Sequence, residues 1–264
     1  MYLSDEELHS FHYNGFLVLR DFATSSDCDA IREVALVHLK YHIEPLETEN
    51  EYGDKSKAHR TEVIDYTSSS SSDNATVRRL RQVYHRDILF KNWMENRKIR
   101  PILQQILNDQ VCLTLAHHNS IMTKMPYSST QTAWHRDRRY WRYGDDNLIS
   151  IWLALGEENS ANGVLEFIPK SHLIDFEENQ FDNKGYFHEK SEKNLSLIET
   201  KVSTDLKKGD VVLFHSKLLH RANANQSDQP KISFVYTVKG ASTKVIKGTR
   251  SASYPEILLN RLDK

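Results

Sequence analysis

The residues best suited to chemistry in this sequence are His135 and Asp137, two positions apart, and a second histidine far downstream, His220. If residues 132–137 form an extended strand, alternate side chains point to the same face, so His135 and Asp137 project together and Arg136 points away. Two imidazoles and one carboxylate that cap one face of a metal suit non-haem Fe(II), because they leave positions open for a co-substrate and O2. The sequence therefore predicts an iron site built from these three ligands.

The tripeptide His-Arg-Asp occurs twice, at residues 85–87 and 135–137, so the motif alone does not locate the site. The first copy lies within residues 78–96, whose pattern is helical. Side chains two apart in a helix point roughly 200° away from each other around its axis, so they cannot share a metal. The second copy lies among strand-like segments, where residues two apart can converge. We therefore assign the metal site to the second copy.

The third ligand is expected to be a histidine downstream of Asp137, and the sequence offers four: His172, His188, His215 and His220. His172 follows a strand-ending proline in a polar turn, and His188 lies in a long polar segment. Both His215 and His220 follow an apolar strand introduced by a Gly-Asp pair. Position alone favours His220 only slightly, because it leads into a turn and the final strand.

The elements that must position these residues are helices first and short strands afterwards. Capping residues predict helices after Ser4 and Thr24, and residues 76–108 have a helical pattern throughout. Helices followed by many short strands predict a mainly β fold with flanking helices, of the double-stranded β-helix (cupin-like jelly roll) type. We expect one domain over residues 1–264, with a helical N-terminal part (1–110) and a jelly-roll core (111–240). Strands are predicted at 111–116, 120–125, 132–137, 148–155, 164–169, 211–215 and 232–238.

Two polar segments interrupt this pattern, residues 44–74 and residues 177–199. The first contains a run of serines at 68–72 and is typical of either a lid over a site or a disordered insert. Loops of such composition are where the choice of substrate is commonly encoded.

The overall composition excludes several classes of partner and site. At 264 residues and a formal net charge of −1, the chain has no global field that favours nucleic acid or an anionic membrane. Its two cysteines, Cys28 and Cys112, are too few for a disulfide framework and fit a reducing compartment. No secretory signal and no apolar run of transmembrane length is apparent. We expect a soluble, cytoplasmic protein whose partner is a small molecule.

Four segments in order along the chain, residues 14–20, 132–137, 162–172 and 209–220, carry a resemblance to a known family. They resemble the phytanoyl-CoA dioxygenase family of Fe(II)/2-oxoglutarate-dependent oxygenases. The resemblance implies a jelly-roll fold, Fe(II) with 2-oxoglutarate and O2, and His220 in the place of the second ligand histidine. The first metal motif alone is a weak signal, but the ordered set of four is specific.

The resemblance also implies a group that anchors the co-substrate. Members of the family usually carry an arginine eleven residues after the second histidine, where this chain has Lys231. Lysine keeps the positive charge but binds a carboxylate as a point charge rather than as a fork, and Ser233 lies on the same face of the strand. Trp152 matches a family tryptophan near the site. The alternatives are a solvated Lys231 and a Trp152 that only packs in the core.

Lys124 and Thr132, on the strands before the metal motif, are further candidates for contact with the co-substrate. The implied activity is hydroxylation with release of succinate and CO2, and the presence of Asp137 argues against a halogenase. Arginines and aromatic residues crowd the motif and suggest an anionic substrate, although acidic neighbours also suit a solvated loop; the candidates are Arg136, Arg138, Tyr140 and Trp141. The rival functions are a catalytically silent jelly-roll binding protein and, less favoured, a zinc hydrolase.

Overall fold

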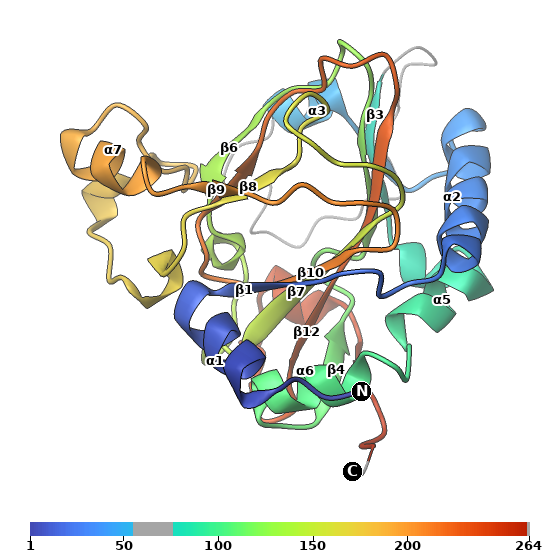
Figure 1. Ribbon diagram of the computed structural model, residues 1–264, viewed down its shortest axis with the longest axis horizontal. Helices are drawn as coiled ribbons and strands as arrows, with labels where there is room; N and C mark the ends of the chain where they lie inside the picture. The colour runs from blue at the N-terminus through green and yellow to red at the C-terminus, as the bar shows by residue number, and fades with distance from the viewer. Residues whose placement is uncertain (55–75, 263–264) are drawn as a thin grey trace.

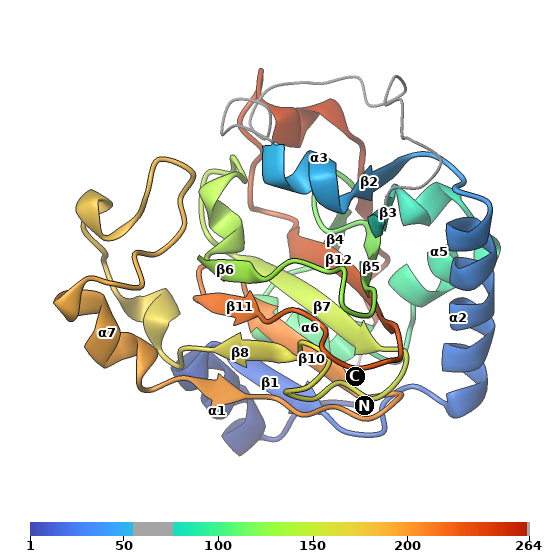
Figure 2. The same ribbon diagram turned by 90° about the horizontal axis from the view of Figure 1, so that it is seen from above.

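The computed structural model describes residues 1–54 and 76–262, which form two antiparallel sheets that face each other (Figures 1 and 2). Within these residues the larger sheet has nine strands, ordered β1-β10-β7-β12-β5-β3-β2, with β4 beside β12 and β13 beside β4. The smaller sheet has four strands, ordered β6-β11-β8-β9. This arrangement confirms the predicted jelly roll with flanking helices.

The strands of the larger sheet are β1 (Phe16–Leu19), β2 (Leu46–Thr48), β3 (Val77–Arg81), β4 (Val111–Thr114), β5 (Ser120–Lys124), β7 (Leu148–Ala154), β10 (Val211–His215), β12 (Lys231–Gly240) and β13 (Glu256–Leu258). Those of the smaller sheet are β6 (Thr132–His135), β8 (Leu165–Phe167), β9 (Val202–Ser203) and β11 (His220–Ala222). The α-helices are α1 (Asp5–Asn14), α2 (Ser25–Lys40), α3 (Glu49–Asp54), α5 (Ile88–Met94), α6 (Arg100–Leu107) and α7 (Glu192–Ile198). Short 3₁₀ turns are η2 (Val83–His85), η3 (Asp137–Arg139), η4 (Ser171–Leu173), η5 (Glu178–Gln180) and η6 (Arg250–Ser253).

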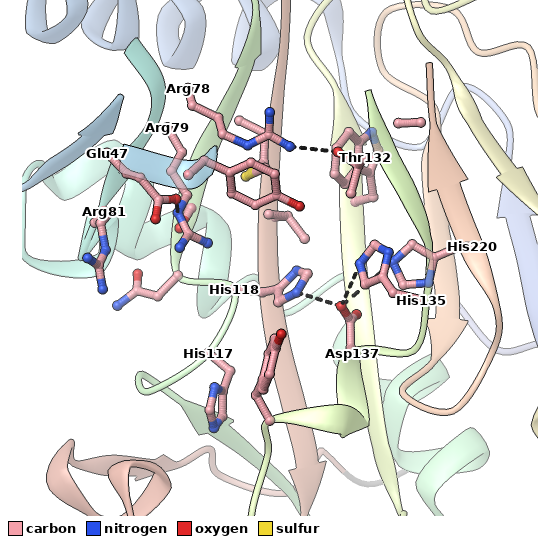
Figure 3. A pocket seen from close by; sticks show the side chains of 18 of the residues that line it. Glu47, Arg78, Arg79, Arg81, His117, His118, Thr132, His135, Asp137 and His220 are labelled. Atoms are coloured by element: carbon pink, nitrogen blue, oxygen red, sulfur yellow. Dashed lines mark hydrogen bonds and ion pairs between the residues drawn. The ribbon is translucent and has the colours of Figure 1, made fainter. Parts of the chain in front are cut away.

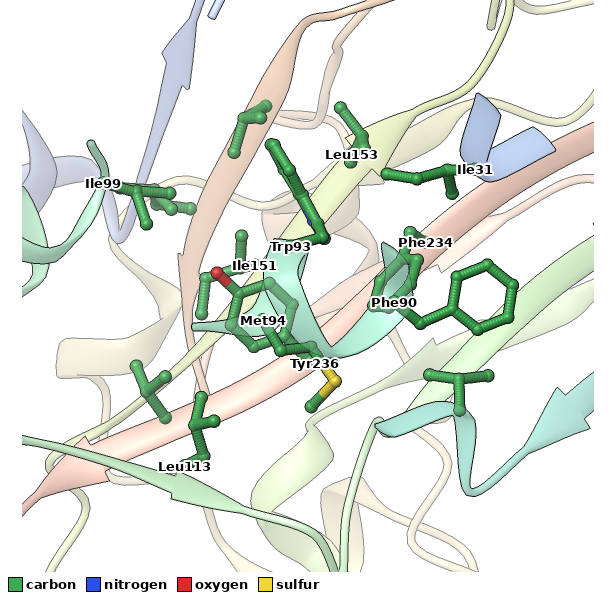
Figure 4. Packing of buried hydrophobic residues seen from close by; sticks show 14 of the residues in the cluster. Ile31, Phe90, Trp93, Met94, Ile99, Leu113, Ile151, Leu153, Phe234 and Tyr236 are labelled. Atoms are coloured by element: carbon green, nitrogen blue, oxygen red, sulfur yellow. The ribbon is translucent and has the colours of Figure 1, made fainter. Parts of the chain in front are cut away.

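Alternation along the central strands divides the interior into two layers. On β7, Ile151 and Leu153 belong to the apolar cluster shared with the helices, whereas Trp152 belongs to the cluster between the sheets. On β12, Phe234 likewise packs toward α5, where its ring meets that of Phe90 (Figure 4). Because side chains alternate across a strand, one face of the larger sheet is covered by helices and the other faces the jelly-roll interior. That interior face carries the candidate site.

The flanking helices begin where the sequence predicts. Ser4 caps α1 in a capping box with Glu7, and the Thr24 hydroxyl accepts a hydrogen bond from the backbone of Asp27 at the start of α2. Figures 1 and 2 place α2 and α5 side by side against the larger sheet, while α1 lies near α6. These helices cover the outer face, so the site opens on the other side of the sheet.

The expectation of continuous helical structure over residues 76–108 was wrong. Residues 77–81 form β3, which pairs with β5 and with β2, and helices α5 and α6 come only after it. Three of its five residues are arginines, so the usual apolar signature of a strand is missing. The larger sheet therefore takes β1, β2 and β3 from the first 110 residues, and β3 brings arginines to the interior face.

The two polar segments differ in how far they are described. Residues 177–199 contain α7, and their aromatic residues pack beside β6: Phe181 and Phe187 share a cluster with Trp134 of β6 and with Leu219. In the first segment, β2 and α3 cover residues 46–54, and residues 55–75 lie outside the described part of the chain. Among the described helices, none is both long and apolar enough to cross a membrane.

Candidate metal centre

The structure brings the three predicted ligands, His135, Asp137 and His220, together at one point. Strands β6 and β11 pair so that His135 lies directly opposite His220, and the centroids of their two rings are 4.2 Å apart. Asp137 follows at the start of η3, with its Oδ1 3.8 Å from His135 Nε2 and 3.6 Å from His220 Nε2 (Figure 3). The three ligand atoms all lie within 4.8 Å of one another. Two nitrogens and one oxygen, all buried and convergent, fit a facial Fe(II) site.

Each histidine is oriented by a carbonyl of its own strand. His135 Nδ1 lies 2.8 Å from the Ala133 carbonyl, and His220 Nδ1 lies 2.9 Å from the Leu218 carbonyl. If Nδ1 carries the proton in each ring, Nε2 presents its lone pair to the centre. Burial lowers the pKa of both histidines and so favours the neutral imidazole that a metal requires.

Asp137 is fixed by two neighbours that hydrogen-bond to different oxygens. Ser150 Oγ donates to Oδ2 at 3.0 Å, and His118 Nε2 lies 2.9 Å from Oδ1. Burial by itself raises the pKa of Asp137, but His118 and His220 outweigh it, so the pKa lies well below its ordinary value. His118 was not predicted, because its sequence signal is only a His-His pair, residues 117–118, just before a strand.

Two of the other candidate histidines have separate partners. His172 Nε2 contacts the carbonyl of His12 at 3.0 Å, and His215 Nδ1 accepts a hydrogen bond from the Lys217 backbone. The first His-Arg-Asp copy is not within a helix as expected, because His85 ends η2 and Asp87 caps α5 through the backbone of Leu89. Those two side chains therefore serve local structure.

The pocket that contains the triad is strongly cationic (Figure 3). Of the residues that the structure describes, eight lysine and arginine side chains line it, against the two carboxylates Glu47 and Asp137; the eight are Arg78, Arg79, Arg81, Lys124, Arg139, Arg221, Lys231 and Arg250. Some have carboxylate partners: Arg78 contacts Glu49 at 2.8 Å, and Arg79 contacts Glu47 at 2.5 Å. Three of the arginines come from β3, the strand that was not predicted from the sequence pattern.

The arginines of the metal motif lie differently from the predicted substrate contacts. Arg136 lies over the rings of Phe176 and Phe181, outside the described lining of the triad pocket. Arg138 also lies outside that lining, and it is bound to Asp146 at 2.6 Å and to backbone carbonyls. Tyr140 and Trp141 do line the pocket. A role in substrate binding remains a prediction for these four residues.

The candidates for co-substrate binding divide into two groups. Lys231, Ser233 and Trp152 converge on the carboxylate of Glu158, which was expected only as one of the acidic neighbours of a solvated loop and is instead fully buried. Lys124 lies on the neighbouring strand, opposite Lys231, and its ammonium donates to the backbone carbonyl of Thr130. Thr132 accepts a hydrogen bond from Arg78 at 2.6 Å. All of them except Ser233 line the pocket, and their contact with a co-substrate remains a prediction.

Comparison with known sequences gives a match over most of the chain. The family model described as Phytanoyl-CoA dioxygenase (PhyH) matches residues 11–233. The Phytanoyl-CoA dioxygenase domain-containing protein 1 of Bos taurus is 20% identical over 91% of this chain and 91% of its own length. The peroxisomal phytanoyl-CoA dioxygenase of Homo sapiens is 24% identical over 85% of this chain and 65% of its own length.

Solved structures with similar architecture include EctD and the epimerase SnoN. The apo form of EctD from S. alaskensis superposes with a TM-score of 0.70 at 17% identity, over 93% of this chain and 80% of that one. The epimerase SnoN, solved with Fe3+, alpha-ketoglutarate and nogalamycin RO, gives a TM-score of 0.71 at 14% identity, over 92% of this chain and 86% of that one. At these identities the likeness establishes the fold.

Proposed function

The chain belongs to the phytanoyl-CoA dioxygenase family and is an Fe(II)- and 2-oxoglutarate-dependent dioxygenase, and we propose that it hydroxylates a small anionic molecule. The observation that carries the proposal is the convergence of His135, Asp137 and His220 at the wall of a pocket rich in cationic side chains. When bound there, Fe(II) with 2-oxoglutarate and O2 supplies the oxidising power for C–H hydroxylation, and succinate and CO2 are the co-products.

The residues of the chain prepare the centre before any ligand arrives. The carbonyls of Ala133 and Leu218 fix the two imidazoles, and Ser150 fixes the carboxylate, so three protein ligands are held on one face. Preorganised ligands of this kind leave the opposite face for small molecules and avoid reorganisation during the reaction. Trp152 and other apolar residues of the pocket wall limit the access of water.

The charge of the pocket supports an anionic substrate. Among the described residues eight lysine and arginine side chains line it against two carboxylates, and an excess of three remains when Glu49, Glu158 and Glu166, the partners of Arg78, Lys231 and Arg221, are also counted. Arg139 lies with its guanidinium over the rings of Tyr140 and Tyr186, an arrangement that keeps the planar group extended. Guanidinium groups bind carboxylate and phosphate with paired hydrogen bonds, so either group on the substrate fits this lining.

The test begins without a substrate. Fe(II) and 2-oxoglutarate are added to the protein under anaerobic conditions, and the weak visible charge-transfer absorption of the chelate is recorded. Small phosphorylated, carboxylated, neutral and cationic molecules are then screened for stimulation of succinate release in air. We expect a chelate band in the wild type, none in His220→Ala, and stimulation chiefly by anionic molecules.

Two other outcomes would replace this proposal. Bound iron without a chelate band, together with hydrolysis that depends on Zn2+, would support the zinc hydrolase. Stimulation of succinate release by neutral or cationic molecules alone would contradict the anionic substrate while leaving the enzyme class intact.

We also propose that the protein acts in the cytoplasm. This is supported by its two cysteines, Cys28 and Cys112, which are free thiols in the structure. Both are buried, and burial raises the pKa of each to about 11, so neither is reactive toward oxidants. Fluorescence microscopy of the tagged full chain tests the location.

A further inference from the structure

The place that the family pattern assigns to the co-substrate anchor is already filled by a carboxylate of the protein itself. Glu158 Oε2 lies 3.0 Å from Lys231 Nζ, and Glu158 Oε1 accepts a hydrogen bond from Ser233 Oγ at 2.6 Å. Trp152 Nε1 approaches both oxygens, at 3.0 and 3.2 Å. Lys231 and Ser233, which were expected to bind the distal carboxylate of 2-oxoglutarate, and Trp152, which was expected near it, therefore surround Glu158.

Glu158 is not poised to leave this position. Its side chain is 0% exposed, and its backbone N–H and carbonyl both bond to the backbone of Leu206. If the carboxylate moved away, Lys231, Ser233 and Trp152 would each lose a buried partner, and a buried unpaired charge costs several kcal/mol. A second carboxylate at the same lysine would meet the repulsion of the first. Lys231 is therefore held in a permanent ion pair with Glu158.

Because Lys231 is paired with Glu158, the positive charge that could bind 2-oxoglutarate is offered by Lys124. The two lysines are directly opposite each other on β5 and β12, so both project from the same face of the sheet into the pocket. Lys124 Nζ donates one hydrogen bond, to the Thr130 carbonyl at 2.8 Å, and an ammonium has three protons to donate. Within residues 1–54 and 76–262, no carboxylate lies at ion-pair distance from it, although only 7% of the residue is exposed.

A glycine opposite Lys124 makes room for its long side chain. A Cβ on Gly163 would lie 2.7 Å from Lys124 Cδ and 2.3 Å from the Asn223 carbonyl, and the φ of Gly163 is +84°. Only glycine tolerates both the conformation and the close approach. The Asn-Gly turn before β8 therefore holds the stem of Lys124 in the pocket wall.

From these contacts we propose that Lys124, in place of Lys231, binds the distal carboxylate of 2-oxoglutarate, and that Glu158–Lys231 is a fixed ion pair of the scaffold. This inference rests on the proposed function, since it names the anchor for that co-substrate. Burial also lowers the pKa of Lys124 to about 7, as do the neighbouring Arg78 and Lys231, whereas Glu49 raises it. An incoming carboxylate relieves that penalty.

The experiment separates the distal carboxylate from the rest of the co-substrate. Anaerobic Fe(II) protein is titrated with 2-oxoglutarate and with 2-oxopentanoate, in which a methyl group replaces that carboxylate, and dissociation constants are read from the chelate absorption. We expect the wild type to prefer 2-oxoglutarate by roughly 10- to 100-fold, the usual worth of a charge-assisted bond. Lys124→Met should abolish this preference and leave the affinity for 2-oxopentanoate unchanged.

The matched control removes Lys231 without leaving a buried charge unpaired. Lys231→Met combined with Glu158→Gln deletes both charges of the pair, and circular dichroism checks that the variant is folded. We expect it to keep the preference for 2-oxoglutarate. A preference lost in this double variant but kept in Lys124→Met would overturn the inference, and so would equal losses in both. A wild type that binds iron but forms no chelate band with either acid would instead refute the proposed function.

Discussion

Replacing Lys124 by methionine should make the ligand-free protein more stable near neutral pH. The pKa of Lys124 falls from 10.5 to about 7, chiefly because burial disfavours the charged form. At 1.36 kcal/mol per pH unit, that difference corresponds to about 5 kcal/mol of destabilisation when the lysine is protonated in both states. Loss of the bond to the Thr130 carbonyl offsets about 1 kcal/mol. With partial relaxation of the site, we expect a net gain of about 2–4 kcal/mol.

The sign of the pH dependence follows from proton uptake on unfolding. Between about pH 7 and pH 10.5 the unfolded chain holds a proton on Lys124 that the folded chain has released, so the stability of the wild type rises with pH across this interval. The advantage of Lys124→Met is therefore largest at or below pH 7 and disappears near pH 10.5. Urea unfolding of both proteins at several pH values measures it, because the difference between them cancels the titration of all other groups.

An exposed lysine provides the control. Lys190 is exposed, and Lys190→Met should change the free energy of unfolding by no more than about 0.5 kcal/mol at any pH. Saturating Fe(II) and 2-oxoglutarate should then stabilise the wild type far more than Lys124→Met, by mass action. A destabilised Lys124→Met at pH 7, or an advantage that does not change with pH, would refute the reasoning that Lys124 is a buried cation with no carboxylate partner in residues 1–54 and 76–262.

Three further predictions concern other parts of the site. Glu158→Leu should cost about 3–5 kcal/mol in urea unfolding because it leaves Lys231 buried and unpaired, and adding Lys231→Met should recover most of that loss. Gly163→Ala should lower both the melting temperature and the affinity for 2-oxoglutarate, since its Cβ would lie 2.3 Å from the Asn223 carbonyl; an unchanged melting temperature would show that this turn can shift. His220→Ala should abolish stoichiometric Fe(II) binding, measured by metal analysis after desalting, and retained iron would exclude His220 as a ligand.

Local sequence was sufficient to predict those features that depend on residues close together in the chain. His135 ends β6 and Asp137 begins η3, but Arg136 between them is extended, so their convergence could be predicted from the local geometry of a strand. The helix starts at Ser4 and Thr24 could be predicted for the same reason, because a cap involves residues only three apart. His220 required the resemblance to a family, since position alone barely separated it from His215.

What only the tertiary structure decided is which partner each buried charge receives. The β3 strand escaped prediction because its arginines point into a pocket instead of solvent. Glu158 and Lys231 are 73 residues apart, and the register of β12 beside β5 is what sets Lys124 opposite Lys231. The sequence supplied two lysines of equal chemistry. The fold gave one of them a buried carboxylate and left the other with a backbone carbonyl, because burial makes every charge depend on the few groups packed around it.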